Sequence, residues 1–258
     1  MRGGGRRRPV VGVSLKMYFD PERTVRWSAA VADIAAQHQA TAAGLVDLFV
    51  LPSLPALNAV VEIFAGTTVS VGAQDLFWED RGPYTGGISG ADLRSLGCSL
   101  VEVGHVDRRR VFGEDDLVVR AKLTAAFRNG LEPVLCVGER QQGPPDAAAS
   151  ACVAQLERAL DGADPGDGAA LIVAYEPEWA IGVGMSADPD HVVTVIGHLR
   201  AWLDNGPLAA PARIIYGGSA GPGLLPMLDG SVDGLFLGRL VHDPLALRPI
   251  LDEALAAR

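Results

Sequence analysis

Short apolar runs rich in β-branched residues alternate along nearly the whole chain with longer stretches whose apolar residues recur at helical spacing. This alternation is typical of repeated strand–helix units around a parallel sheet. Continuously apolar strands indicate a sheet covered on both faces, and eight such units can close into a barrel. The pattern predicts an α/β protein, a single (β/α)8 TIM barrel, with a doubly wound open sheet as the structural alternative.

Eight strands and eight following helices are predicted. The strands are residues 10–14, 48–51, 68–72, 100–103, 133–137, 171–175, 213–216 and 234–237. The helices are residues 24–38, 55–64, 89–96, 116–129, 147–160, 188–203, 223–228 and 245–256.

The chain of 258 residues, 48% of them hydrophobic, fits one domain, because barrels of about 250 residues are routinely undivided. No linker separates two halves, since the Gly/Pro-rich segments 143–145 and 162–168 only flank a helix. We expect residues 9–258 to form the barrel and residues 1–8, rich in Gly and Arg, to form a disordered basic tail. The apolar run 9–15 ends at Lys16 and is too short for a signal-peptide core or a membrane span.

A formal net charge of -9 argues against affinity for nucleic acid or an anionic membrane, because both polyanions would repel the protein. Three cysteines, Cys98, Cys136 and Cys152, form neither a CxxC pair nor a metal-binding spacing. Their odd number argues against a disulfide framework and indicates a reducing compartment, so we expect a cytoplasmic protein without a metal site.

Polar residues just beyond the carboxyl ends of the strands are the candidates for chemistry in a parallel barrel. Glu176 directly ends an apolar run, where partial desolvation would make it a stronger base. His105 could polarise a carbonyl, and Lys16 could offset the charge of an enediolate. Taken singly, each has an ordinary interpretation: a helix-cap glutamate, a loop histidine, and a lysine paired with a carboxylate such as Asp107.

Glycine-rich loops follow the sixth, seventh and eighth predicted strands. Gly182 and Gly184, the segment 217–219 and Gly238 can bring backbone N–H groups close to an anion. A net-negative protein can therefore bind phosphate through local dipoles, although an ordinary turn explains any one of these loops alone.

Ten short stretches together resemble the triosephosphate isomerase family. They come in family order from the first strand to the last, and Ala-Tyr-Glu-Pro, Trp-Ala-Ile-Gly and Tyr-Gly-Gly-Ser in succession are highly specific. The stretches are Lys16-Met17, Gly72-Ala73-Gln74-Asp75, Tyr84-Thr85-Gly86, Val103-Gly104-His105, Asp107-Arg108-Arg109, Leu135-Cys136-Val137-Gly138-Glu139, Ala174-Tyr175-Glu176-Pro177, Trp179-Ala180-Ile181-Gly182, Tyr216-Gly217-Gly218-Ser219 and Asp233-Gly234.

The resemblance implies that Glu176 is the base that shuttles a proton between two carbons, while neutral His105 moves protons between the oxygens and Lys16 lies beside the substrate. The family is itself the standard illustration of a carboxylate base beside a neutral histidine, so these roles are taken over from it. The resemblance implies no metal and no organic cofactor.

The resemblance also implies a mobile lid at residues 177–186 that excludes water from the enediolate when it closes. The lid contains Pro177, Trp179, Ala180, Ile181, Gly182 and Gly184. Tyr216 and Ser219 would latch it, and the backbone N–H groups of Gly182, Ser219 and Gly238 would hold the phosphate of a small phosphorylated sugar.

The loop 74–87 resembles the family's dimer loop, which implies a homodimer with Thr85 next to the partner's active site. Gly87 stands where the family usually has a glutamate that supports this contact.

Other departures from the family pattern lie at the site. Ser14 replaces the usual asparagine, Val106 and Asp107 replace serine and glutamate after the histidine, and Arg239 replaces a second glycine after Gly238. Ser14 enlarges the space beside the substrate's carbons, and Arg239 brings a cation to the phosphate end. A longer sugar phosphate could fit, and Ser-x-Lys-Met is associated with relatives that isomerise erythrulose phosphates.

Three functions follow as hypotheses. The first is isomerisation of dihydroxyacetone phosphate and glyceraldehyde 3-phosphate, as in glycolysis and gluconeogenesis. The second is isomerisation of L-erythrulose 1-phosphate and D-erythrulose 4-phosphate by the same proton transfers. The third is a non-catalytic sugar-phosphate-binding protein on the same scaffold, against which the presence of Lys16, His105 and Glu176 argues.

Overall fold

A computed structural model describes residues 8–163, 165–166, 169–206, 212–228 and 230–257. Residues 1–7 of the predicted tail lie outside this range. Arg8, its last residue, is described, and its guanidinium lies 3.2 Å from the Asp47 carboxylate.

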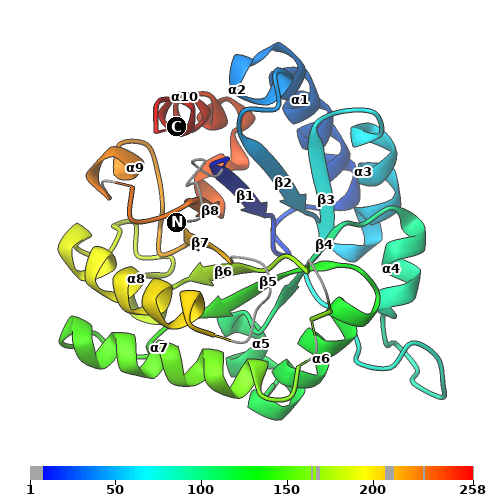
Figure 1. The fold of residues 1–258 in the computed structure, drawn as a ribbon. Helices are drawn as coiled ribbons and strands as arrows, with labels where there is room; N and C mark the ends of the chain where they lie inside the picture. The colour runs from blue at the N-terminus through cyan, green and yellow to red at the C-terminus, as the bar shows by residue number, and fades with distance from the viewer. Residues whose placement is uncertain (1–7, 164, 167–168, 207–211, 229, 258) are drawn as a thin grey trace.

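Eight parallel strands form a closed barrel in chain order (Figure 1). Closure is made where the first strand pairs with the last, with Val10 opposite Gly234 and Val13 opposite Leu237. The predicted barrel is confirmed, and the open sheet is wrong. The strands are β1 (Val10–Ser14), β2 (Asp47–Leu51), β3 (Val69–Ala73), β4 (Leu100–Val103), β5 (Glu132–Val137), β6 (Ile172–Tyr175), β7 (Arg213–Tyr216) and β8 (Gly234–Leu237).

Helices surround the ring of strands, and their bounds agree with the sequence prediction to within a few residues (Figure 1). The short helices α2 and α5 were not predicted, and α5 begins directly after His105. Within the described ranges, no helix is long and apolar enough to cross a membrane. The helices are α1 (Pro21–Gln37), α2 (Gln39–Ala42), α3 (Leu57–Phe64), α4 (Gly90–Leu96), α5 (Val106–Val111), α6 (Asp116–Arg128), α7 (Pro145–Leu160), α8 (Pro189–Asp204), α9 (Leu224–Met227) and α10 (Leu247–Ala256).

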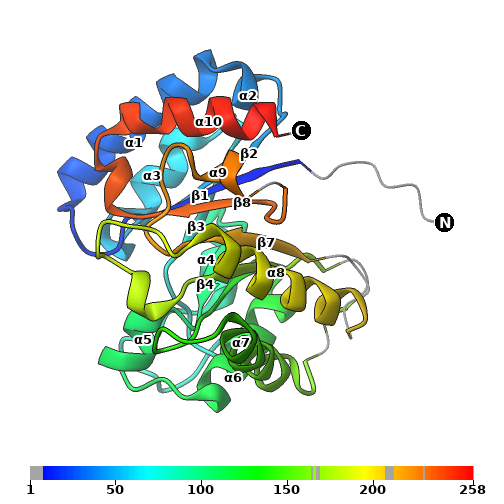
Figure 2. The ribbon, with the colours of Figure 1, turned by 90° about the vertical axis from the view of Figure 1, so that its left-hand side faces the viewer.

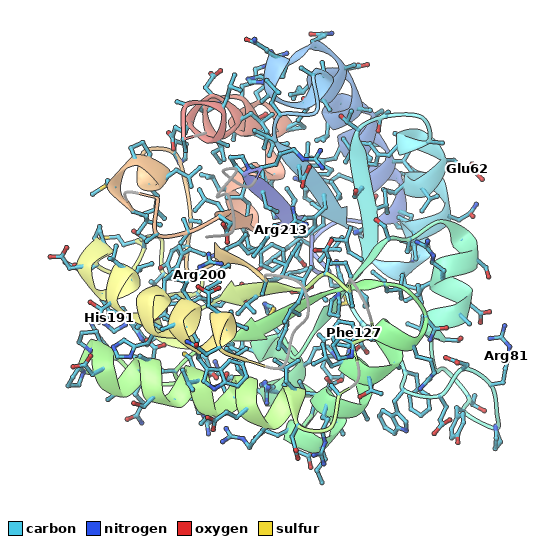
Figure 3. The ribbon with its side chains drawn as sticks, viewed as in Figure 1. Glu62, Arg81, Phe127, His191, Arg200 and Arg213 are labelled. Atoms are coloured by element: carbon cyan, nitrogen blue, oxygen red, sulfur yellow. The ribbon has the colours of Figure 1, made fainter. Side chains whose placement is uncertain are left out.

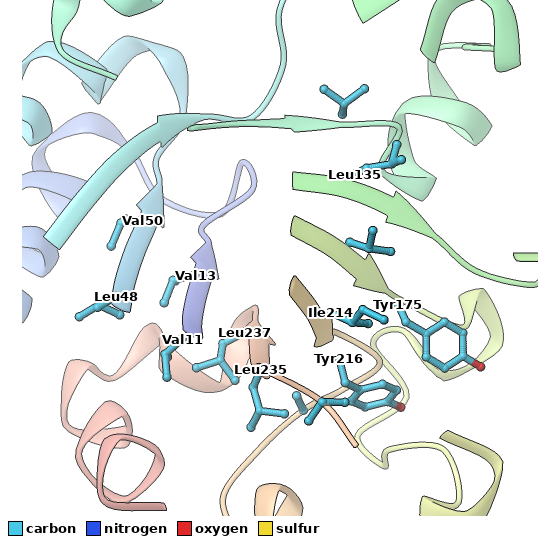
Figure 4. Packing of buried hydrophobic residues seen from close by; sticks show 14 of the residues in the cluster. Val11, Val13, Leu48, Val50, Leu135, Tyr175, Ile214, Tyr216, Leu235 and Leu237 are labelled. Atoms are coloured by element: carbon cyan, nitrogen blue, oxygen red, sulfur yellow. The ribbon is translucent and has the colours of Figure 1, made fainter. Parts of the chain in front are cut away.

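Alternate side chains of the strands build two apolar layers, because successive residues of a strand point to opposite faces. Outward-facing residues such as Val11, Val13 and Leu235 pack under the helices (Figure 4). The inward-facing residues fill the barrel itself and form a second cluster: Val10, Phe49, Leu51, Leu100, Val134, Cys136, Ile172, Ala174, Ile215 and Phe236. These side chains pack the interior of the barrel, so a substrate that binds at the barrel lies at its mouth.

Glycine is required at Gly234, the residue that begins β8. Its φ is +158°, and a Cβ atom there would lie 1.7 Å from the carbonyl oxygen of Val10. Only a residue without a side chain lets β8 approach β1 closely enough to complete the barrel.

An ion cluster spans the amino ends of three strands. Arg213 of β7 donates to Asp47 of β2 at 2.6 Å and to Glu132 of β5 at 2.9 Å, and its side chain is 20% exposed. Figure 3 shows Arg213 near the middle of the ring of strands. One guanidinium thus holds together strands that are not neighbours in the sheet.

We predict that Arg213→Ala lowers the free energy of unfolding by about 2 kcal/mol, because it leaves Glu132 without its cation and Asp47 with only the exposed Arg8. Urea denaturation followed by circular dichroism measures the change. Arg26→Ala is the matched control, because the Arg26–Glu22 pair is well exposed and its loss should change stability by less than about 0.5 kcal/mol. Equal effects of the two substitutions would contradict the role given to Arg213.

Candidate active site

A cavity of about 470 Å³ lies at the carboxyl ends of the strands. In side view, the loops that follow β1, β6 and β8 gather at this end, opposite the end where β1 begins (Figure 2). Most of the residues that the sequence singled out line it: Ser14, Lys16, His105, Glu176, Ile181, Gly182, Gly184, Ser219, Gly238 and Arg239. Pro177, Trp179, Ala180 and Tyr216 are not part of its lining.

Glu176 and His105 face each other inside this cavity. His105 Nε2 lies 3.6 Å from Glu176 Oε2, and the two residues are 5% and 7% exposed. Neither atom has a hydrogen-bond partner among the described residues. Buried polar atoms are rarely left unpaired, so a pair of them aimed into one cavity indicates atoms that a substrate satisfies.

The orientation of His105 comes from helix α5, which it caps. Its Nδ1 accepts a hydrogen bond from the backbone N–H of Asp107 at 3.0 Å. An imidazole nitrogen that accepts carries no proton, so this bond assigns the ring proton to Nε2, the nitrogen that faces Glu176. A neutral ring in this tautomer can donate to an oxygen in the cavity.

Glu176 directly follows β6, and its backbone N–H donates to Val137 O at 2.8 Å. A Cβ atom on Gly217 would lie 2.6 Å from Glu176 Oε1. A Cβ atom on Gly138 would lie 1.9 Å from the carbonyl oxygen of Glu176. Glycines at the ends of the two neighbouring strands therefore make the room in which this carboxylate lies.

Lys16 adopts a left-handed backbone conformation with φ +49°. Its Nζ donates to Asp107 Oδ2 at 3.0 Å, and its carbonyl accepts from Gln74 Nε2 at 3.0 Å. Burial lowers the pKa of the Lys16 ammonium, but the attraction of Glu176 and Asp107 outweighs burial and holds this pKa above its usual value. The ordinary pairing with Asp107 is thus present, and the cation still lines the cavity beside Glu176.

Ser14 ends β1, and its hydroxyl lies 3.0 Å from Oε2 of Glu102, a buried residue of β4. Sequence reasoning missed Glu102. A signal existed, because Glu102 is a charged residue inside the otherwise apolar run Leu100–Val103. Burial raises the pKa of the Glu102 carboxyl most strongly, His105 lowers it, Glu176 raises it, and the net shift is upward.

Side chains from the loops after β7 and β8 hold the segment 177–187. Tyr216 Oη accepts from Ala187 N at 2.9 Å and donates to Gly218 O at 2.7 Å. Ser219 Oγ donates to Ala180 O at 2.7 Å, and Arg239 Nη2 donates to Gly182 O at 2.6 Å. The two residues expected as a latch and the unexpected Arg239 therefore all contact this segment.

A second polar cluster, which the sequence analysis also missed, contacts the segment 177–187 at Trp179. Glu139 accepts from Trp179 Nε1 at 2.7 Å and lies within 3.2 Å of the Tyr175 hydroxyl and of His191 Nε2. His191 belongs to α8 (Figure 3). Trp179 is thus fixed from behind, and it does not contribute to the lining of the cavity.

The end of the cavity that we expect to hold phosphate is lined by Gly182 and Gly238, with one difference at Ser219. Ser219 has φ +56°, and its backbone N–H donates to Gly217 O at 3.0 Å within its own turn. The amide that we expected to hold phosphate is therefore partly engaged. No cluster of three or more His, Cys, Asp or Glu side chains that could hold a metal ion occurs in the described part of the chain.

A buried carboxylate facing an imidazole N–H, with an ammonium group beside them at the mouth of a (β/α)8 barrel, defines an enzyme that moves protons between neighbouring atoms of a small substrate. The profile of the triosephosphate isomerase family matches residues 9–254. The chain belongs to this family and is an isomerase of small phosphorylated sugars.

Relatives of two kinds match almost the whole chain. An L-erythrulose-1-phosphate isomerase of Pectobacterium atrosepticum is 49% identical over 96% of each chain. A triosephosphate isomerase of Moorella thermoacetica is 38% identical over 95% of this chain and 98% of the relative. The crystal structure of triosephosphate isomerase from Bartonella henselae superposes with a TM-score of 0.80 at 29% identity, covering 95% of this chain and 98% of that one.

We predict that Tyr216→Phe loosens the segment 177–187, because Ala187 N and Gly218 O lose their buried partner. The free energy of local opening should fall by about 1 to 3 kcal/mol, and backbone amides of this segment should exchange with deuterium faster. Amides of β3, on the opposite side of the barrel from β7, are the internal control. Unchanged exchange throughout 177–187 would show that the hydroxyl does not hold the segment.

Proposed function

We propose that this enzyme interconverts L-erythrulose 1-phosphate and D-erythrulose 4-phosphate. The observation that carries the proposal is the identity of 49% to an L-erythrulose-1-phosphate isomerase over 96% of both chains, against 38% to the triosephosphate isomerase described above. An L-erythrulose-1-phosphate isomerase of Rhizobium etli supports it, at 39% identity over 89% of this chain. The triose hypothesis is the second candidate, supported by the other relatives.

The two substrates need the same proton transfers. In a 1-phosphorylated 2-ketotetrose, the carbon after the carbonyl carries a hydrogen, a hydroxyl group and a hydroxymethyl group. One proton moves from this carbon to the carbonyl carbon, and one moves between the two oxygens, so the carbonyl shifts by one position. Counted from the other end, the product is the 4-phosphate. The triose substrate differs by lacking the hydroxymethyl group.

We assign the proton between carbons to Glu176, which is buried and has an unpaired oxygen in the cavity. His105 Nε2–H donates to the carbonyl oxygen and moves protons between the oxygens. The hydrogen bond that Nδ1 accepts from Asp107 N leaves the ring proton on Nε2, as this role requires. Lys16 offsets the negative charge of the enediolate, and its neighbours keep it charged. All of these steps move protons between the enzyme and the substrate, so the reaction needs no further reactant.

In our proposal the added hydroxymethyl group lies beside Ser14. A second cavity of about 440 Å³ is also lined by Ser14, Lys16 and His105, so it adjoins the first. An asparagine in place of Ser14 would extend further into this region. The shorter side chain fits a substrate that is one carbon longer.

The phosphate is held in our proposal by the backbone N–H groups of Gly182, Ser219 and Gly238, with the Arg239 guanidinium beside them. Arg239 also donates to Gly182 O, so it ties the phosphate end of the cavity to the lid. The lid is residues 177–186, held by Tyr216 and Ser219, and its closure excludes water from the enediolate.

We propose a homodimer through the loop 74–87, which contains Thr85. This loop projects from the barrel, with Arg81 at its far end (Figures 1 and 3). Tyr84 of this loop is 43% exposed. Phe112 and Met17, which line the second cavity, are 65% and 91% exposed. A partner's loop would cover such a surface. We also place the enzyme in the cytoplasm, supported by the free thiols of Cys98, Cys136 and Cys152.

The purified protein should show a kcat/KM for L-erythrulose 1-phosphate at least about 100-fold above that for glyceraldehyde 3-phosphate. Ser14→Asn should move this ratio toward the triose by about tenfold, because it refills the space beside the reacting carbons. Coupled assays of both substrates measure the ratio. A ratio in favour of the triose would make triosephosphate isomerisation the function, and no turnover of either would leave a sugar-phosphate-binding protein.

Glu176→Asp should slow kcat by about 100-fold, because the carboxylate is withdrawn by about 1 Å from the reacting carbon. Binding of a non-reacting phosphate analogue should change little, because the glycine loops are untouched. Turnover and calorimetric binding are measured on the same preparation. Wild-type turnover in this variant would remove Glu176 from the mechanism.

Thr85→Arg should shift the protein from dimer to monomer in sedimentation velocity, because it places a bulky cation in the proposed interface. Thr67→Arg is the control, because Thr67 is exposed at the opposite end of the barrel, just before β3. A wild-type protein that sediments as a monomer would overturn the dimer proposal.

A further inference from the structure

Glu102 is a buried carboxyl group at the mouth end of the barrel interior, next to the apolar cluster that fills it. It is 3% exposed. Leu100, two residues earlier on β4, belongs to the apolar cluster of the barrel interior, as does Cys136 of β5. An ionised carboxylate in such surroundings is unfavourable by several kcal/mol unless it is paired or takes up a proton. The position therefore needs a reason beyond packing.

The contacts of Glu102 lead to the cavity. Its Oε2 lies 3.0 Å from Ser14 Oγ, and its Oε1 lies 3.8 Å from Cys136 Sγ. Ser14 in turn lines both cavities at the mouth of the barrel. Glu102 also lines the second cavity, next to Ser14 and His105. A buried carboxyl group thus lies directly behind a hydroxyl group that faces the substrate.

The protonation state of the Glu102 carboxyl determines the direction in which the Ser14 hydroxyl proton points. Burial raises the pKa of Glu102 and Glu176 raises it further, against the lowering effect of His105, Lys16 and Ser14. A carboxyl that retains its proton can donate to Ser14 Oγ, and the Ser14 proton then turns toward the cavity. An ionised carboxylate would instead accept the Ser14 proton and leave only lone pairs facing the substrate, because a hydroxyl has one proton to donate.

We propose that Glu102 is a positioning residue for the isomerase: its carboxyl O–H donates to Ser14 Oγ and so presents the Ser14 O–H as a donor to the substrate oxygen that becomes negative in the enediolate. The pair Ser14–Glu102 thereby supplies a hydrogen-bond donor at the position where the family usually has asparagine. The inference rests on the proposed proton transfer through an enediolate, and it holds for a triose or a tetrulose substrate.

The test compares Glu102→Gln with Glu102→Leu in the full-length protein. A glutamine amide is neutral and can donate to Ser14, whereas leucine cannot. Glu102→Leu should lower kcat by about 10- to 100-fold and change KM by less than about threefold, because the donor acts on charge that develops in the transition state. Glu102→Gln should restore kcat to within about fivefold of the wild-type value. Equal kcat losses in both variants would overturn the proposal.

A double-substitution cycle separates this role from a structural one. Glu102→Leu added to Ser14→Ala should cost no further activity, because Glu102 acts only through Ser14. Multiplicative losses would contradict the proposal. Leu100→Ala is the matched control: it opens a cavity in the same interior two residues earlier on β4, so it should lower the melting temperature and leave kcat within about twofold.

Infrared spectroscopy tests the protonation of Glu102 without activity. The wild-type protein at neutral pH should show the C=O band of a protonated carboxylic acid that is missing in Glu102→Gln. A difference spectrum with carboxylate bands alone would overturn the inference. If the wild-type protein turns over neither sugar phosphate, the proposed function fails, while this band still reports on Glu102.

Discussion

Closure of the sheet between β1 and β8 is the constraint on which the rest of the structure depends. It requires a glycine at Gly234, because any Cβ there would collide with Val10. Once the ring closes, the parallel strands bring all their carboxyl ends to one mouth, and residues as distant in the chain as Lys16, Glu176 and Arg239 line one cavity. The packed interior below leaves the mouth as the place for a substrate.

The buried polar groups at this mouth lower the stability of the barrel. Glu176 and His105 are buried with unpaired atoms, each of which costs about 1 to 3 kcal/mol in a protein without a ligand. The apolar layers on both faces of the strands offset this cost. In our proposal these same atoms contact the substrate, so the groups that destabilise the free protein are the groups that carry out the reaction.

The residues at which this chain departs from the family pattern surround the three side chains that we propose as the reacting groups. Ser14 and Arg239 alter the two ends of the cavity, while Glu176, His105 and Lys16 remain. Ser14 gains a buried partner in Glu102, and Arg239 gains the carbonyl of Gly182 in the lid. In our proposal the proton transfers depend on these three side chains and the shape of the cavity depends on others, so the substrate can change while the chemistry stays the same.

The sequence by itself determined the barrel, all eight strands and many of the residues that line the mouth, because strand periodicity and strand-end position are local properties of the chain. It left out helix α5, which orients His105, since a six-residue helix has too short a pattern to detect. Only the tertiary structure decided that Glu102 lies behind Ser14, that Arg239 reaches Gly182, and that Glu139 holds Trp179. Each of these pairs joins different strand-end loops or strands, and its geometry exists only after the barrel has closed.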